Sequence, residues 1–194
     1  MDKLERRNIT YKVTADEESR TVEGYALLFD TPSDGLWFEE TIERGALDGV
    51  LEKSDVFALL NHNTDRGVLA RWNKQAITLS LSVDNQGLKY SFDAPNTALG
   101  DELLENIRRG EITTSSFSFT VEKDTWEDKG NGQYARTIHK IDKLYDVSPV
   151  YNAAYSKTSV YSRGIDELKS SKEEEERKSE LEGYWSSINQ KFNI

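Results

Sequence analysis

Short runs of alternating apolar and polar residues, separated by turn-forming residues, extend from Asn8 to about Arg163. A period of two residues places every second side chain on one face, which is typical of a half-buried β-strand. The clearest run is AITLSLSV at residues 76–83, which the turn sequence DNQG joins to LKYSF at residues 88–92, and it predicts a β-hairpin. Further strands are expected at residues 9–13, 22–29, 56–60 and 112–121, and a pair of strands at residues 134–150.

Two segments have the spacing of helices instead. Residues 97–109 begin with Thr97, which can cap a helix, carry leucine and isoleucine at helical spacing, and end before Gly110. Residues 42–51 form a shorter amphipathic candidate. Because short strands outnumber helices, the sequence predicts an α+β fold in which helices pack on a mostly antiparallel, β-barrel-like or sandwich-like core.

The composition changes after Arg163. Residues 164–194 lack the alternating pattern and contain 8 acids and 5 bases, including four consecutive glutamates at residues 173–176. We therefore expect a domain at residues 1–163 and a charged tail, helical or flexible, at residues 164–194. One apolar stripe in the tail has helical spacing and is a candidate docking surface; it consists of Trp185, Ile188 and Phe192.

Composition excludes several classes of function. The chain has no cysteine, which excludes disulfides, iron–sulfur clusters, cysteine zinc sites and thiol catalysis. Its two histidines lie far apart and it has no glycine-rich phosphate loop, so we expect neither a metal nor a cofactor. The net charge of -10 argues against nucleic acid as a partner. The apolar runs are too short to span a membrane and the N-terminus lacks a secretory signal, so we expect an intracellular protein.

Two segments carry candidate catalytic residues. His62 follows an apolar strand in LLNHN, where its ring would be fixed yet accessible; it is a candidate general base, or an ordinary residue of a polar turn. Ser116 and Ser118 in TTSSFSF share one face of the expected strand, while Phe117 and Phe119 share the other. Either serine becomes a nucleophile only if an imidazole accepts its proton.

Asp146 interrupts the apolar strand LYDVSPV. A carboxylate at such a position is costly unless it is paired or hydrogen-bonded. It is therefore either an edge-strand charge that faces water or a carboxylate that orients an imidazole, as in a Ser-His-Asp triad. Residue types alone leave these alternatives open, since scattered Ser, His and Asp occur in nearly every domain.

The order and context of these segments resemble the HK97-type phage prohead proteases, the maturation proteases of tailed phages, over nearly all of residues 6–163. The similar blocks are GYALLFDTP (24–32), FEETIERGAL (38–47), DVFALLNHN (55–63), LAR (69–71), the helix and strand from residue 100 to residue 119, and LYDVSPVYNAAY (144–155). The chain departs from the family at Ser118, where Gly is common, at Asn152, where Pro is frequent, and at Asp146, where many relatives have Glu.

This resemblance implies a fold similar to that of the herpesvirus assemblin proteases and a serine protease mechanism. By its match to the serine block of the family, Ser116 would be the nucleophile, with His62 as the general base. Asp146 fills the acidic position and would orient the imidazole. The resemblance implies no cofactor.

Three further assignments remain open within the resemblance. Ser118 is a rival nucleophile because this chain has a second serine where the family commonly has Gly. His139 is a rival third member, because assemblin-type proteases use a second histidine. Arg71 is a candidate for placing an oxyanion-hole donor, by analogy with an arginine in assemblins; otherwise it is a surface charge on a strand.

The resemblance also implies partners and a location. The expected substrates are the major capsid protein with its scaffolding segment, or a separate scaffold protein, and the protease itself, which could form a homo-oligomer. Such a protease acts in the host cytoplasm, inside the assembling procapsid. The tail would target the enzyme there and be removed by self-cleavage. The alternative is a non-enzymatic internal scaffolding protein that keeps the fold and binds capsid subunits through its acidic tail.

Overall fold

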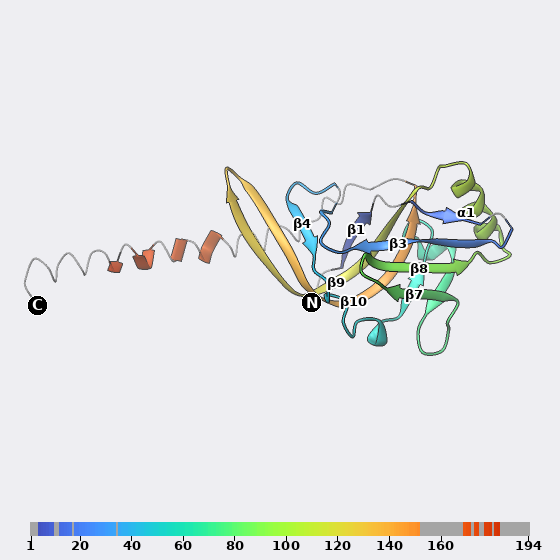
Figure 1. Ribbon diagram of the computed structural model, residues 1–194, viewed down its shortest axis with the longest axis horizontal. Helices are drawn as coiled ribbons and strands as arrows, with labels where there is room; N and C mark the ends of the chain where they lie inside the picture. Colours follow the sequence, from blue (N-terminus) through green and yellow to red (C-terminus); the bar gives the residue numbers. More distant parts are fainter. Residues whose placement is uncertain are drawn as a thin grey trace, which may run out of the picture.

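The computed structural model describes residues 4–9, 12–16, 18–33, 35–151 and, in the tail, residues 169–171, 173–174, 177–179 and 181–182. The described strands form two sheets (Figure 1). The two sheets share one hydrophobic core. The expected mixed fold with mostly antiparallel strands is confirmed. The expected barrel is wrong, because the strands of the described part make two separate sheets and do not close on themselves.

The larger sheet has six strands and positions the candidate site. Its strands follow the order β1 (Glu5–Ile9), β9 (Thr114–Gly130), β10 (Gln133–Val150), β5 (Val56–Ala58) and β6 (Ala70–Trp72), and β4 (Glu39–Ile42) also pairs with β10. β9 and β10 are antiparallel and extend from the body as a long hairpin (Figure 1). β10 is parallel to β4 and β5. β10 therefore connects most of the sheet.

The smaller sheet is antiparallel throughout. Its order is β2 (Thr14–Ala15), β3 (Thr21–Leu28), β8 (Gly87–Asp93) and β7 (Leu79–Val83). The hairpin of β7 and β8 confirms the one predicted from alternation and the DNQG turn. β3 and β8 approach so closely at Gly87 that a Cβ there would lie 1.9 Å from the backbone oxygen of Leu27, so only glycine fits.

One α-helix packs on the sheets within the described body, α1 (Ala98–Arg108). Its start and end confirm the prediction from sequence. The side chain of Thr97 accepts a hydrogen bond from the backbone N–H of Gly100 at 3.3 Å. Gly110, at φ +75°, ends the segment with a conformation that favours glycine.

The helix expected at residues 42–51 is wrong. Ile42 closes β4, and the chain then passes through turns to a short 3₁₀ helix, η1 (Leu51–Lys53). Gly45 and Gly49 have φ angles of +88° and +68°, which are incompatible with a right-handed helix. The apolar residues of this segment have helical spacing, but the backbone forms turns at the two glycines. These turns bury Ala46, Leu47 and Val50.

Residues 134–150 form one strand, β10, and not the expected pair of strands. β10 pairs with β9 along nearly its whole length, with several register shifts where bulges interrupt the ladder. Bulges bend a strand without ending it, and they also break the local alternation from which strand ends are inferred. The sequence pattern of the long strands β9 and β10 therefore resembles that of several shorter strands.

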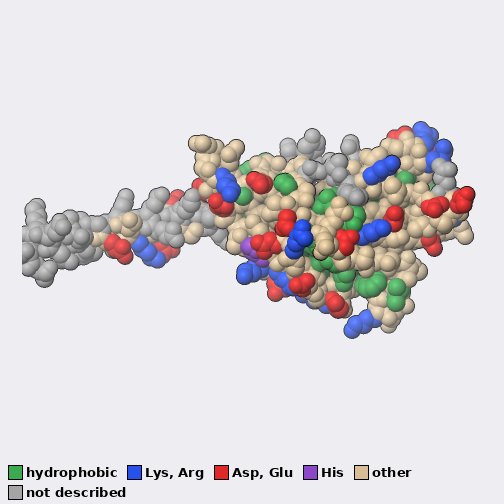
Figure 2. Space-filling view, in the orientation of Figure 1, with side chains coloured by type: hydrophobic (Ala, Val, Ile, Leu, Met, Phe, Trp, Pro, Cys, Tyr) green, Lys and Arg blue, Asp and Glu red, His purple; other side chains and the backbone are tan. Residues whose placement is uncertain are grey.

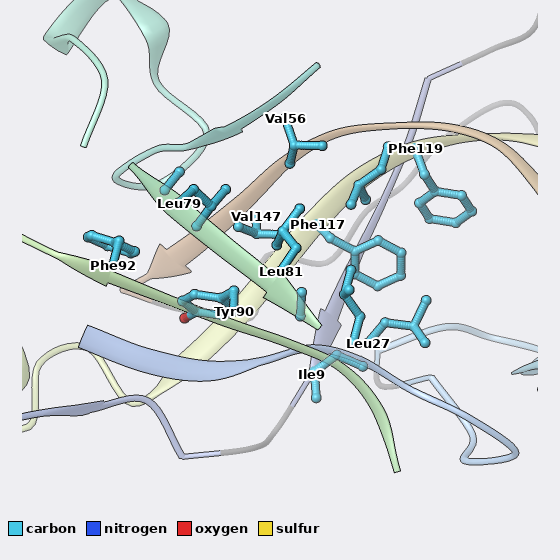
Figure 3. Packing of buried hydrophobic residues seen from close by; sticks show 14 of the residues in the cluster. Ile9, Leu27, Val56, Leu79, Leu81, Tyr90, Phe92, Phe117, Phe119 and Val147 are labelled. Carbon is cyan, nitrogen blue, oxygen red and sulfur yellow. The ribbon is translucent and has the colours of Figure 1, made fainter. Parts of the chain in front are cut away.

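The core lies between the two sheets, as Figure 3 shows. Phe117 and Phe119 of β9 are fully buried in it, with ring centroids 4.8 Å apart, so the expected inward face of this strand is confirmed. Tyr90 of β8 is also fully buried, and its hydroxyl lies 2.7 Å from Ser115 Oγ. The pleat of β9 therefore places Ser116 and Ser118 on the opposite face of the larger sheet.

The surface is charged and mixed. Acidic and basic side chains are interspersed over the face in Figure 2. The described residues of the tail are helical and exposed, and Lys178 Nζ lies 3.3 Å from Glu174 Oε1. The boundary at Arg163 and the stripe of Trp185, Ile188 and Phe192 lie outside the described residues and stay predictions. No helix in the described part of the chain is both long and apolar enough to cross a membrane.

Candidate active site

Three neighbouring strands bring distant parts of the sequence together on one face of the larger sheet. The register of β9 and β10 pairs Ser116 with Ser148 and Ser118 with Asp146. β5 lies beside β10 on its other side and ends shortly before His62. The serine and the carboxylate thus come from two adjacent strands and the imidazole from the turn that follows a third, and hydrogen bonding of the sheet fixes their spacing.

The backbone around His62 directs its ring toward these strands. Leu59 N–H donates to the backbone oxygen of Val147, and Asn61 N–H donates to that of Pro149 at 3.0 Å, so the chain still follows β10 after β5 has ended. Asn61 and His62 then have φ angles of +55° and +57°. Such angles cost on the order of 1 kcal/mol or more for a residue other than glycine, and they concentrate at functional sites.

His62 bridges the other two residues. Its Nδ1 lies 2.6 Å from Asp146 Oδ1, and its Nε2 lies 2.6 Å from Ser116 Oγ. An ionised carboxylate only accepts hydrogen bonds, so Nδ1 carries the proton and donates it to Asp146. Nε2 is then an acceptor, and Ser116 donates its hydroxyl proton to it. This is the tautomer that a general base toward Ser116 requires.

Hydrogen bonds keep the Asp146 carboxylate ionised in a buried position. Burial raises the pKa of Asp146, but hydrogen bonds from His62, Ser118 and Ser148, together with the electrostatic interaction with His62, hold that pKa below its usual value. Ser148 Oγ donates to Asp146 Oδ1 at 2.6 Å. Of the two alternatives that the sequence left open for Asp146, the structure shows the buried, hydrogen-bonded carboxylate and not a charge that faces water.

The three side chains of the site are largely buried. Ser116 is 1% exposed, and the side chain of His62 is 11% exposed. Low exposure strengthens the electrostatic interactions among the charged and polar groups of the site.

The two candidate serines contact different nitrogen atoms of the imidazole. Ser118 Oγ lies 3.3 Å from His62 Nδ1, the nitrogen that already donates to Asp146, and 3.2 Å from Arg6 Nε. Ser116 contacts Nε2, the nitrogen that is free to accept a proton. The geometry therefore favours Ser116 over Ser118 as the residue that His62 can deprotonate.

His139 lies away from this site. Its Nδ1 is 2.7 Å from Glu43 Oε2 and its Nε2 is 2.9 Å from Thr125 Oγ1. His139 precedes Asp146 by seven residues on the same strand, a separation of about 20 Å along β10. The structure brings Asp146, and not His139, to His62.

Arg71 is on β6, at the far edge of the sheet. Its guanidinium binds both carboxylate oxygens of Asp55, at 2.8 and 2.5 Å, and stacks on the ring of Phe57 at 4.7 Å. β6 is separated from β9 by β10 and β5, so its backbone lies about 14 Å from that of Ser116. These contacts hold the Arg71 side chain beside Asp55 and Phe57. They give no support to Arg71 as the residue that places an oxyanion-hole donor.

Two residues at the site were missed in the sequence. Ser148 follows Asp146 by two positions on a strand, so the two-residue period could have placed it on the same face. Arg6 could not be found in this way, because its partner Ser118 is 112 residues away in the sequence. Among the described residues, no group of three or more His, Asp or Glu side chains has a geometry that could hold a metal ion.

Comparisons with known proteins agree with this arrangement. The chain is similar in fold to the capsid assembly protease of bacteriophage T4, gp21, with a TM-score of 0.51 and 13% identity over 77% of this chain and 97% of that one. No curated protein matches the sequence. The family described as Caudovirus prohead serine protease matches residues 7–172, which include the serine, the histidine and the aspartate that the sheet brings together. The chain belongs to this family of prohead serine proteases.

Proposed function

We propose that this protease cleaves peptide bonds by acyl transfer, with Ser116 as nucleophile, His62 as general base and Asp146 as orienting carboxylate. The observation that carries the proposal is the continuous series of hydrogen bonds from Ser116 Oγ through both nitrogen atoms of His62 to Asp146. Each of the three side chains has the hydrogen-bond partner that this chemistry needs, and the imidazole has the required tautomer.

The reaction proceeds in two halves. Ser116 Oγ attacks the carbonyl carbon of the substrate and its proton passes to His62 Nε2. The tetrahedral intermediate collapses, the C–N bond breaks, and His62 returns the proton to the leaving amine. Water then attacks the acyl-enzyme with His62 again as base, which releases the carboxylic acid and restores the Ser116 hydroxyl. The Asp146 anion stabilises the imidazolium in both halves.

We infer that the substrates are the scaffolding segment of the major capsid protein and the protease itself, inside the procapsid in the host cytoplasm. The family of the chain and its fold similarity to a capsid assembly protease support a capsid substrate. The tail at residues 164–194 would direct the protease into the procapsid and be removed by self-cleavage. A non-enzymatic scaffolding protein would not need the His62 tautomer that favours catalysis.

A covalent probe tests the proposal. A fluorophosphonate transfers its phosphonyl group to a catalytic serine as fluoride leaves, and peptide mapping then identifies the labelled residue. We expect label on Ser116 in the unmodified chain, none in Ser116→Ala, and almost none in His62→Ala. Co-expression with the major capsid protein of the same phage should give cleavage with the same dependence. Labelling of Ser118, or cleavage by Ser116→Ala, would contradict the proposed nucleophile.

A further inference from the structure

The N-terminal strand β1 places a cation beside the proposed catalytic centre. β1 is the edge strand next to β9, and its register sets Arg6 opposite Ser118. The side chain of Arg6 therefore lies on the face that carries the site, and its Nε is 3.2 Å from Ser118 Oγ. Arg6 itself is exposed, whereas Ser118 is fully buried.

The direction of these hydrogen bonds follows from which groups can donate. A guanidinium only donates, so Ser118 Oγ must accept from Arg6. The nearby Nδ1 of His62 already carries a proton, so it offers no lone pair to the Ser118 hydroxyl. The register of β9 and β10 sets Ser118 directly opposite Asp146, so the proton of Ser118 is left to point at that carboxylate. Arg6 thus fixes the orientation of a hydroxyl that would otherwise rotate.

The opposite face of β1 is anchored in the protein interior. Glu5 and Arg7 point away from the site and are 3% and 1% exposed. Arg7 donates to Glu40 Oε2 at 2.6 Å, and Arg136 lies 2.7 Å from Glu5 Oε2. A shift of β1 by one residue would bury Arg6 in place of these partners. The buried ion network therefore fixes the register that brings Arg6 to Ser118.

We propose that Arg6 is a positioning residue of the Ser116–His62–Asp146 centre and acts through Ser118. The inference rests on the proposed function. Through Ser118, Arg6 holds a third hydrogen-bond donor on the Asp146 carboxylate, beside those from His62 and Ser148. It stands on the Nδ1 side of the imidazole, away from the Nε2 side where the substrate carbonyl would meet Ser116. The N-terminal strand is then part of the active site and not only an edge of the sheet.

The test compares two reactions in the full chain. The rate of Ser116 labelling by a small fluorophosphonate needs the catalytic centre but no peptide contacts, whereas cleavage of the capsid protein needs both. We expect Arg6→Met to slow both reactions by a similar factor of about 10, the size of one hydrogen bond to a charged group. Arg6→Lys keeps a charged donor and should recover most of the rate. Arg44→Met removes another exposed arginine, bound to Asp30, and should leave both rates unchanged.

A double-mutant cycle shows whether the effect runs through Ser118. Ser118→Ala should slow labelling by a comparable factor, and Arg6→Met combined with Ser118→Ala should be no slower than Ser118→Ala alone. Additive losses would overturn the proposal, as would a loss of cleavage with normal labelling, because Arg6 would then contact the substrate. Unchanged rates in Arg6→Met would overturn the role proposed for Arg6 and would leave the proposed function standing. Absence of Ser116 labelling in the unmodified chain would instead overturn the proposed function, and this inference with it.

Discussion

His62 Nδ1, in the turn after β5, and Asp146 Oδ1, on the adjacent strand β10, lie 2.6 Å apart, and this contact determines which imidazole nitrogen faces Ser116. An asparagine in place of Asp146 could present its amide N–H₂ to Nδ1. The ring would then hold its proton on Nε2, where the proton of Ser116 has to go.

We therefore expect Asp146→Asn to fold normally and to lower cleavage by about 10⁴. His139→Ala is the matched control, because His139 is the other histidine and contacts Glu43 and Thr125 instead of the site. It should cleave almost normally. Capsid-cleavage rates, with circular dichroism to verify folding, check both variants. An inactive His139→Ala beside an active Asp146→Asn would reverse the assignment of the third residue.

Ser116 and His62 should behave as one unit. Ser116→Ala and His62→Ala are each expected to lower the cleavage rate by about 10⁴ to 10⁶, and the double variant should be little worse than either. Single-turnover cleavage of the capsid protein measures this. Ser118→Ala should retain clear activity, since Ser118 contacts the nitrogen that cannot accept its proton. The nucleophile would have to be reassigned if Ser118→Ala were inactive while Ser116→Ala still cleaved.

Local patterns predicted the parts of this fold that depend on neighbouring residues. The period of two identified β3, β8 and the inward Phe117 and Phe119, and the capping of Thr97 with the stop at Gly110 identified α1. The turns after Ile42 were missed, because apolar spacing does not report which φ angles two glycines adopt.

Long-range pairing was the part that the sequence could not supply. Nothing local to Arg6 or Ser118 indicates that β1 lies against β9, since the register depends on the buried network of Glu5 and Arg7 on the other face of the strand. The same limit applies to Arg71. Its place on the far side of β5 follows from the order of the strands in the sheet, which cannot be inferred from the alternation of apolar and polar residues.

The lowered pKa of Asp146 predicts how stability depends on pH. A carboxyl whose pKa is lower in the folded than in the unfolded state contributes stability above its ordinary pKa of 3.8, and this contribution is lost as the pH falls through the folded value. We expect Asp146→Asn to have a lower Tm than the unmodified chain at pH 7. The two Tm values should converge as the pH is lowered below about 4. A Tm difference that stays constant from pH 7 to pH 3 would show that the charge of Asp146 does not stabilise the fold.

The tail is expected to be dispensable for folding. It lacks the alternating pattern of the core, and the residues described in it are exposed. A chain that ends at Arg163 should therefore melt within a few degrees of the full chain in a thermal scan, because changes at the surface cost little stability. A large drop in Tm, or insolubility, would indicate that Trp185, Ile188 and Phe192 dock on the body.

Arg136 provides the sharpest test of the buried ion network. Its guanidinium is 4% exposed and contacts Glu5 at 2.7 Å and Glu40 at 3.0 Å. Arg136→Met would fill a similar volume but leave two carboxylates short of a partner in the interior. We expect a loss of about 3–5 kcal/mol in the free energy of unfolding, measured by urea titration. Arg44→Met, which breaks the exposed pair with Asp30, should cost about 1 kcal/mol or less. Equal losses for the two variants would mean that the network does not hold β1 and β10 together.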